Sequence, residues 1–415
     1  MIIVESTDLA IGMFVSKLDR PWTETSFLLQ GVLIESDDDR QEFINVCDYV
    51  YVDQQRSHDS VHARLVVLEN QKVTIRPVKA AKELKYTAEM ADKEQAFFSR
   101  ELIHARSVHK NTRGYIDQAL EDARLGNSLN TEDAKVFVSE IAESVSRAPN
   151  AMLWLTHMKQ RDEYTSNHCM NVCILAVTFG CALGLEKKQL HSLGMGALLH
   201  DLGKMKIPLE ILNKPGRLTT EEYELIKTHS REGYEMLKSK GGVSNEILEI
   251  VLSHHERIDG SGYPAGKPGE LVSLLSQITS VVDVYDAITS NRCYHDGMPP
   301  HEAMKLMYEW SGRNFAPELI EGFIKCLGIY PIGSLIKLNS RHIGVVIAAS
   351  KNSRLRPIIL LVIDRQGQTL DPPQVVNLAH PKWSTGQTKL KIQKIVRPED
   401  YNIDLAAIVA NTSVS

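Results

Sequence analysis

The sequence lacks any apolar stretch long enough for a membrane-spanning helix. Its longest apolar stretches, VCILAVTFGCALGL and PIILLVI, fall short of the roughly 20 residues that such a helix needs. The N-terminus, MIIVESTDLA, has no basic segment followed by an apolar core. We therefore expect no signal peptide, no membrane segment and a cytoplasmic location.

Cysteines are few and form no CxxC pair. The six are scattered along the chain, which is usual for a reducing compartment. Cys169 and Cys173 are one helical turn apart and close to His168, a pattern that raises a zinc site as one interpretation. Since no second Cys/His pair follows at zinc-finger spacing, we interpret both cysteines as buried packing residues.

The sequence also has no excess of positive charge. Its 47 Lys and Arg residues face 52 Asp and Glu residues, for a net charge of −5. This balance offers no basic field for a nucleic acid polymer or an anionic membrane. The length of 415 residues and the 43% hydrophobic content predict a globular protein of two or three domains.

The hydrophobic patterning divides the chain into four parts. Residues 1–70 alternate short apolar and polar runs, typical of a small β-rich domain. Residues 71–150 have charged, amphipathic helical patterns that predict a helical connector. Residues 151–330 have apolar residues at helical spacing almost throughout, and residues 331–415 contain β-strand patterns. We predict a multi-domain protein with an all-α central domain, a β-rich N-terminal domain and a small β appendage.

Local signals mark where several elements begin. Thr219 and Glu222 can form a capping box at the start of a helix. Ser244 can cap the helix NEILEIVLSHHE, and Pro317 suits the first turn of PELIEGFIKCLG. Gly367, after Gln366, predicts a turn between two strands of the appendage.

Polar residues occupy core positions in the helical part. His168, for example, shares a helix face with Val172 and Leu175. A buried carboxylate is unfavourable by several kcal/mol unless it is paired or binds a metal. One such histidine would be interpreted as a packed core residue, but a metal cluster explains the whole set at once. The set is His168, His200, Asp201, His229, His254, His255 and Asp283.

The predicted cluster has the composition of a two-metal site. Asp201 has two oxygens and can bridge two cations. Two ions about 3.5–4 Å apart can position a water molecule for in-line attack on phosphorus. Because most donors are nitrogen, a transition metal is favoured over magnesium.

Three motifs together resemble those of the HD-GYP domain, a subgroup of the HD phosphohydrolases. They are HDLGK at 200–204, HHERIDGSGYP at 254–264 and DVYDAITSNRCY at 283–294. The resemblance implies an HD-type helical fold for the central domain. The first region, from LAIGMFVSKLDRPW to CDYVYVD, resembles the uncharacterised domain that often precedes HD-GYP.

The resemblance implies hydrolysis of cyclic di-GMP to the linear dinucleotide pGpG, and often on to GMP. It also implies two divalent metal ions, iron or manganese first, with nickel, cobalt or zinc as alternatives. By motif position the seven residues above match the metal ligands, with Asp201 and Lys204 as the catalytic residues. The implied substrate contacts are Lys204, Gly262, Tyr263, Pro264, Arg292 and His295.

Some positions depart from the family pattern. Tyr164 stands where some members have a glutamate that binds a third metal, and Glu163 lies about 140° around the helix from His168. We therefore expect two metals. His295 replaces a second basic residue, and Asp286 is expected to support a ligand from outside the metal shell.

Two alternatives remain open at this point. The substrate could be the mixed 3′3′-cyclic GMP–AMP dinucleotide, because the sequence does not reveal which base edge the pocket reads. The domain could also be a catalytically weak HD-GYP module that signals through protein contacts. A homodimer or a signalling protein partner is compatible with each alternative.

Overall fold

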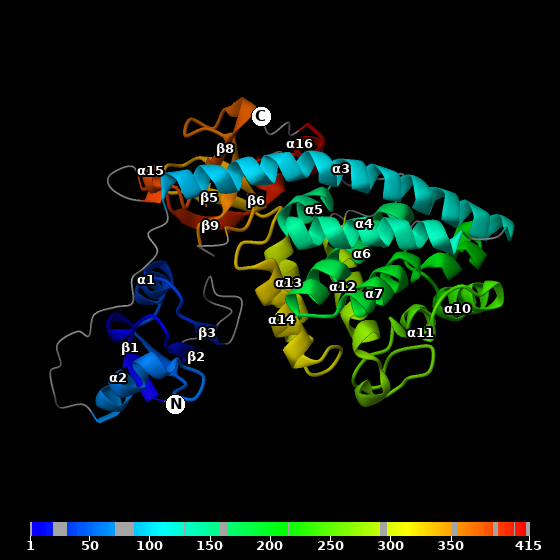
Figure 1. Cartoon of the computed structure of the whole chain (residues 1–415), viewed down its shortest axis with the longest axis horizontal. Coiled ribbons are helices and arrows are strands. Elements are labelled where there is room, and N and C mark those ends of the chain that lie inside the picture. The colour runs from blue at the N-terminus through cyan, green and yellow to red at the C-terminus, as the bar shows by residue number, and fades with distance from the viewer. Residues whose placement is uncertain are drawn as a thin grey trace.

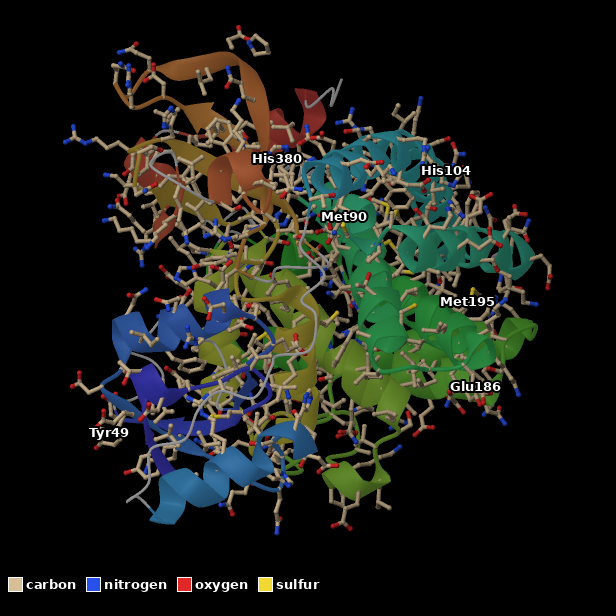
Figure 2. The ribbon with its side chains drawn as sticks, turned by 60° about the vertical axis from the view of Figure 1, so that its left-hand side comes forward. Tyr49, Met90, His104, Glu186, Met195 and His380 are labelled. Atoms are coloured by element: carbon tan, nitrogen blue, oxygen red, sulfur yellow. The ribbon has the colours of Figure 1, made fainter. Side chains whose placement is uncertain are left out.

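The computed structural model describes residues 2–19, 31–70, 87–127, 130–157, 164–214, 216–290, 297–350, 355–384, 389–401 and 403–411. Figure 1 shows three parts: an N-terminal domain, a helical body beneath the long helix α3, and a C-terminal β appendage beside the start of α3. Figure 2 shows His380 of the appendage near Met90 at the start of α3, and His380 Nε2 lies 3.8 Å from Asp92 Oδ1.

The N-terminal domain is an antiparallel sheet with two helices. The four strands have the order β1-β4-β2-β3. Val50 and Val52 of β4 point into a core that also contains Phe43 and Leu65, whereas Tyr49 is exposed, as expected for a sheet with one covered face. The elements are β1 (Ile2–Glu5), η1 (Ser6–Asp8), β2 (Phe14–Leu18), β3 (Val32–Leu33), α1 (Asp37–Val46), β4 (Tyr49–Val52) and α2 (Asp59–Asn70).

Two long helices connect this domain to the body. α3 (Ala88–Leu125) is capped by Thr87 and ends at Gly126, whose φ of 78° is the left-handed conformation that glycine adopts without strain. α4 (Thr131–Arg147) is capped by Asn130. Both helices contribute buried residues to the core of the helical body, so the amphipathic pattern predicted for this region corresponds to two packed helices.

The helical body positions the site. It contains α5 (Pro149–Leu155), α6 (Tyr164–Ala182), α7 (Lys187–Leu199), η4 (Leu202–Lys206), α8 (Leu209–Leu212), α9 (Thr220–Lys227), α10 (His229–Lys240), α11 (Asn245–Ser253), η5 (Gly269–Leu271), α12 (Leu274–Thr289), α13 (Pro300–Glu309) and α14 (Pro317–Leu327). The predicted starts are confirmed. Thr219 and Glu222 form the capping box of α9, Ser244 accepts from Ile247 N at α11, and Pro317 opens α14.

The appendage is a five-stranded antiparallel sheet of order β8-β7-β6-β5-β9. All residues of β6 and β7 are buried, because alternate side chains enter two different cores. Val345 packs into the core of the helical body, whereas Val346 packs into a smaller core within the appendage. The elements are β5 (Leu335–Leu338), β6 (Ile343–Ala348), β7 (Ile358–Ile363), β8 (Thr369–Asn377), α15 (Pro381–Ser384), β9 (Ile392–Val396), η6 (Pro398–Tyr401) and α16 (Leu405–Asn411).

The predicted arrangement is confirmed: a helical core lies between an N-terminal sheet domain and a C-terminal β appendage. The turn at Gly367 joins β7 and β8 as predicted. Within the described residues, no helix combines the length and the apolar character needed to cross a membrane. Cys169 and Cys173 are buried, and burial raises the pKa of Cys173 to about 12, as expected for packing residues that stay protonated.

Candidate metal centre

The seven residues predicted as metal ligands converge in the middle of the helical body. They come from α6, the end of α7, the start of η4, the start of α10, the end of α11 and the middle of α12. Their ligand atoms form two groups, and within each group the atoms lie within 4.8 Å of one another. The first group is Asp201, His229, His254 and His255; the second is His168, His200 and Asp283.

Asp201 lies between the two groups. Its Oδ1 is 3.4 Å from His229 Nε2, in the first group. Its Oδ2 is 3.3 Å from His200 Nε2 and 3.6 Å from His168 Nε2, in the second group. One carboxylate therefore presents a separate oxygen to each half of the cluster.

Three of the histidines are oriented by the helix ends on which they lie. Nδ1 of His200 is 2.8 Å from the carbonyl oxygen of Ala197, three residues earlier. His229 and His254 make the same contact with the carbonyls three residues before them, at 2.7 and 2.9 Å. Because a carbonyl oxygen can only accept, Nδ1 carries the proton in each ring. The lone pair of each Nε2 is thus directed into the cluster.

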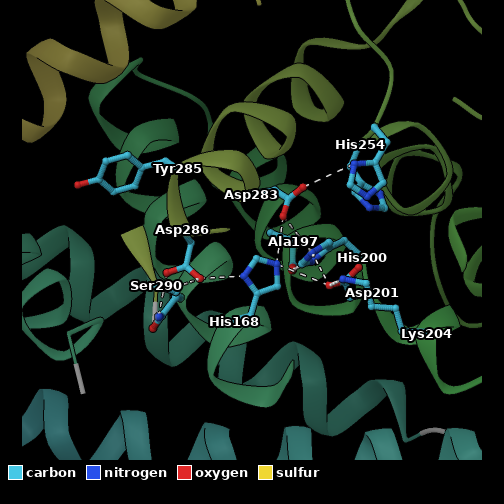
Figure 3. A network of polar contacts seen from close by, with 12 residues as sticks. His168, Ala197, His200, Asp201, Lys204, His254, Asp283, Tyr285, Asp286 and Ser290 are labelled. Atoms are coloured by element: carbon cyan, nitrogen blue, oxygen red, sulfur yellow. Dashed lines mark hydrogen bonds and ion pairs between the residues drawn. The ribbon is translucent and has the colours of Figure 1, made fainter. Parts of the chain in front are cut away.

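His168 is oriented by a side chain instead of a backbone carbonyl. Its Nδ1 is 2.8 Å from Asp286 Oδ2, and its Nε2 is 3.0 Å from Asp283 Oδ1 (Figure 3). Asp286 also accepts from Asn171 Nδ2 at 3.0 Å and from Ser290 Oγ at 3.1 Å. Asp286 thus contacts Nδ1 of His168, while Nε2 of the same ring faces the cluster, and Asp286 belongs to neither ligand group.

The electrostatics of the first group favour neutral imidazoles. Burial lowers the pKa of His229 to about 4, and it holds the pKa values of His254 and His255 well below their usual range. These rings are therefore uncharged at neutral pH, which is the form that binds a metal.

The carboxylates are ionised. Burial alone would raise the pKa of Asp201, but the neighbouring His200 ring and the Lys204 ammonium group outweigh it and hold that pKa well below its usual range. Burial would likewise raise the pKa of Asp283, but the hydrogen bond from His168 outweighs it and holds that pKa well below its usual range. Burial lowers the pKa of His168, but Asp283 and Asp286 raise it to about 9.

These residues fit a metal centre. His200 Nε2 and Asp201 Oδ1 are buried and have no hydrogen-bond partner among the described residues. A buried polar atom without a partner is costly, and coordination of a cation would satisfy both atoms. Five imidazoles and two carboxylates are a donor set suited to a first-row transition metal.

The glycine-rich turn after the paired histidines covers one side of the cluster. Tyr263 stacks on His255, with ring centroids 4.6 Å apart, and Pro264 follows it in the same half-buried turn. Glu256 fixes this turn, because its carboxylate accepts from the backbone N–H groups of Ala265 at 2.8 Å and Lys267 at 3.0 Å. A Cβ at Gly262 would lie 2.4 Å from the backbone nitrogen of Arg257, so only glycine fits there.

The remaining predicted residues differ in what the structure describes. Lys204 lies at the edge of the cluster, with Nζ 2.5 Å from Asp201 Oδ2 and a partly exposed side chain. Arg292 and His295 lie outside the described residues, so their predicted contacts stay predictions. The same holds for the side chain of Tyr164 and for Glu163.

Several residues around the cluster were not among those predicted from the sequence. Glu256 carries no helical periodicity that would mark it as buried, although its position directly after two histidines is a signal. Lys227 Nζ lies 4.8 Å from the ring centroid of Tyr223 and 5.7 Å from that of Tyr263. Tyr223 is 48% exposed. A row of aromatic and cationic side chains therefore leads from His255 through Tyr263 and Lys227 to an exposed ring.

Comparison with known proteins agrees with this geometry. Residues 146–319 match the HD domain family, residues 2–134 match a domain of unknown function (DUF3391), and residues 335–403 match a KOW domain associated with the HD domain. A cyclic di-GMP phosphodiesterase of Pseudomonas aeruginosa is 36% identical over 92% of this chain and 89% of its own length. The chain belongs to the HD-GYP family.

Other HD-GYP relatives match over shorter spans. A cyclic di-GMP phosphodiesterase response regulator of Xanthomonas campestris is 36% identical over 44% of this chain and 47% of its own length. A 3′3′-cGAMP-specific phosphodiesterase of Vibrio cholerae is 37% identical over 38% of this chain and 36% of its own length. Relatives of this HD-GYP chain are thus named for two different cyclic dinucleotides.

Proposed function

We propose that this protein is a metal-dependent phosphodiesterase that hydrolyses cyclic di-GMP to the linear dinucleotide pGpG. The position of Asp201 carries the proposal, because its two oxygens face two separate groups of ligands. This is the arrangement that a pair of metal ions bridged by one carboxylate requires. The similarity to the Pseudomonas phosphodiesterase over 92% of the chain supports cyclic di-GMP as the substrate.

The seven cluster residues would hold two divalent transition-metal ions, with iron or manganese as our first choice. When bound, such ions stabilise the charge on the phosphate and activate a water molecule for in-line attack. His168, His200 and Asp283 would hold one ion, and His229, His254 and His255 the other, with Asp201 shared between them.

The other proposed roles belong to the rim of the cluster. Lys204 is close enough to Asp201 to place its ammonium group on a phosphate oxygen that enters the site. Gly262, Tyr263 and Pro264 would form the wall beside His255. Arg292 and His295 follow α12 in the sequence, and we propose that they bind the second phosphate or a base of the substrate.

The decisive experiment is anaerobic purification followed by metal analysis and chromatography of the products. We expect two metal ions per chain, conversion of cyclic di-GMP to pGpG, and slower conversion of 3′3′-cyclic GMP–AMP. The same chromatogram reports whether GMP follows pGpG. Faster turnover of the mixed dinucleotide would contradict the substrate assignment, and a metal-loaded protein with no turnover of either would identify a signalling module.

A variant at the shared carboxylate tests the two-metal arrangement directly. Asp201→Ala should abolish hydrolysis of both cyclic di-GMP and bis(p-nitrophenyl) phosphate, because it removes the bridge between the ligand groups. A folded Asp201→Ala protein that keeps more than a few per cent of the turnover would show that the bridge is not required. Asp48→Ala is the matched control, since Asp48 is an exposed aspartate of the N-terminal domain, outside the helical body.

A further inference from the structure

The helix α9 places an exposed aromatic ring and a lysine beside the metal cluster. Tyr223 and Lys227 are one turn apart on this helix, which ends two residues before His229. Tyr263 stacks on His255 with ring centroids 4.6 Å apart, and Lys227 Nζ lies 5.7 Å from the Tyr263 centroid. The same Nζ is 4.8 Å from the Tyr223 centroid. Successive contacts, none longer than 5.7 Å, thus lead from a proposed metal ligand to the Tyr223 ring.

The Tyr223 ring is open to a ligand. It is 48% exposed, so a flat aromatic face is available at the rim of the site. Burial raises the pKa of Tyr263, and the neighbouring Tyr223 raises it further, because the two phenol groups are close to each other. A purine can stack on an exposed tyrosine ring, and such stacking tolerates any base. Tyr223 therefore offers a platform for a base without choosing which base it is.

The ammonium group of Lys227 keeps donors for a ligand. One of its three N–H groups donates to Glu224 Oε1 at 2.6 Å. The other two have no acceptor within the described residues. The side chain of Glu224 is 60% exposed, so this ion pair holds the ammonium group in place without enclosing it. A base that stacks on Tyr223 would have the remaining donors of Lys227 at its edge.

The two purines present different groups to such an ammonium group. Guanine has two adjacent acceptors, O6 and N7, and a lysine can donate to both. Adenine has N7 as an acceptor but an N6–H₂ donor in place of O6, so its amino group would face the donors of Lys227. A lysine at the edge of a stacked base therefore favours guanine, by about 5- to 150-fold for a good bidentate contact.

We propose that α9 forms a guanine subsite, in which Tyr223 stacks on a base of the substrate and Lys227 donates to its O6 and N7. The inference rests on the proposed function and names the residues that select the base. Lys204, whose Nζ lies beside Asp201, would hold the phosphate at the cluster. Lys227, on the far side of Tyr263 from His255, would hold the base of the same nucleotide.

Competition by mononucleotides tests the base contact without turnover of a cyclic dinucleotide. Hydrolysis of bis(p-nitrophenyl) phosphate by the full-length, metal-loaded protein is measured with GMP or AMP as the inhibitor. We expect the inhibition constant of GMP to be about 5- to 150-fold lower than that of AMP. Lys227→Met, which has no donor, should remove most of this difference, and Lys227→Arg should keep it, because a guanidinium group also donates to O6 and N7. Tyr223→Ala should weaken both nucleotides and leave their ratio unchanged.

A second ion pair supplies the matched control. Lys135 and Glu132 on α4 have the same three-residue spacing and the same distance of 2.6 Å as Lys227 and Glu224. Lys135→Met should change neither inhibition constant. Thermal melting identifies a variant that does not fold, and calorimetric titration with GMP and AMP gives the same ratio for a folded variant that is too slow to assay.

The mixed dinucleotide provides a second measurement. 3′3′-cyclic GMP–AMP contains one guanine, so a guanine subsite would bind it in one orientation and expose one of its two phosphodiester bonds to hydrolysis. We expect one linear dinucleotide, pGpA or pApG, to exceed the other by about fivefold or more in the wild type. Lys227→Met should form the two in similar amounts, and chromatography measures both.

Several results would overturn the subsite. They are equal inhibition by GMP and AMP in the wild type, equal amounts of the two linear dinucleotides, and an unchanged GMP preference in a folded Lys227→Met variant. Loss of GMP and AMP binding by the same factor in that variant would also overturn it, since it would place Lys227 on the phosphate. Failure of the proposed function is distinct: the wild type would then leave cyclic di-GMP intact, whereas failure of the subsite removes only the preference for guanine.

Discussion

Replacing Asp286 by asparagine should weaken metal binding without removing any proposed ligand. The carboxylate is buried and accepts from three donors: His168 Nδ1, Asn171 Nδ2 and Ser290 Oγ. Asparagine has a single acceptor oxygen and two N–H donors. If the oxygen keeps its contact with His168, the new NH₂ group faces the NH₂ group of Asn171, and two buried donors are left without an acceptor.

The magnitude follows from these contacts. An unsatisfied buried donor costs about 1–3 kcal/mol, and the ring of His168 loses the negative charge that polarises it. Outer partners of ligating histidines typically change metal affinity by about 10- to 100-fold. We therefore expect Asp286→Asn to lower the affinity for Mn²⁺ by a factor in this range, about 1.4–2.7 kcal/mol.

The assay titrates metal-free protein with Mn²⁺ against a competing chelator and follows metal content and turnover of bis(p-nitrophenyl) phosphate. Saturating metal should restore most of the activity, because every ligand is still present. Ser290→Ala removes only one hydrogen bond to the same carboxylate and should change affinity less than tenfold. Unchanged metal affinity in a folded Asp286→Asn protein would refute the positioning role, as would lost activity that saturating metal cannot restore.

Three further predictions test the surroundings of the cluster and the stability of the fold. Gly203→Ala should destabilise the protein by about 1–3 kcal/mol and impair metal binding, because the new Cβ would lie 1.9 Å from the carbonyl oxygen of His229. Thermal melting and metal content measure the two effects, and an unchanged melting curve would contradict this contact. Burial lowers the pKa of His109 from 6.5 to about 4 in the folded protein. As the pH drops from 6.5 to 4, the unfolded chain therefore binds a proton that the folded protein does not, and the free energy of unfolding should fall by about 3 kcal/mol. Urea titrations should show that His109→Leu reduces the loss of stability over this pH range by about this amount, and that a substitution at the exposed His104 leaves the loss unchanged. Tyr223→Ala should raise the KM for cyclic di-GMP by about 5- to 100-fold, because a base of the substrate loses its stacking partner, whereas Tyr223→Phe keeps the ring and should not. An equal rise in the KM for a small diester would exclude base stacking.

The residues of the candidate site could be predicted because they interrupt strong helical patterns. His168 and Asp283 occupy positions in α6 and α12 that periodicity assigns to the core, and both are buried. His254 follows the apolar run of α11 and caps its end. Local sequence determines these features, since a helix face and a helix end are both set within a few residues.

Features that depend on distant contacts were not predictable in the same way. Glu256 has its role only because the chain turns back and brings the N–H groups of Ala265 and Lys267 to it. The contact between Arg356 and Asp38 joins residues 318 positions apart. No periodicity reports such a pair, so the packing of α1 against the appendage had no signal in the sequence.

Three elements have sequences that only weakly indicate the structure they form. β8 contains Pro372 and Pro373, which argue against a strand, yet it lies at an edge of the sheet where proline is tolerated. β9 is the opposite edge strand, and Lys394 interrupts its apolar pattern as charged residues on edge strands often do. In α1 only Phe43 is buried, so its helical period was too weak to separate it from the surrounding strands.

The position of Lys204 connects the sequence motif to the proposed chemistry. HDLGK places the lysine three residues after Asp201, and the 3₁₀ turn of η4 brings its Nζ to 2.5 Å from Asp201 Oδ2. In this arrangement the ammonium group balances part of the charge of a buried carboxylate that would otherwise be costly. Metal ions in the two ligand groups would take over that balance, and the lysine side chain, which is 20% exposed, would be free to turn toward a substrate phosphate. The short spacing of the motif is thus compatible with two roles for Lys204: its ammonium group stabilises Asp201 in the metal-free site, and under the proposed function it would bind a substrate phosphate once the metals are bound.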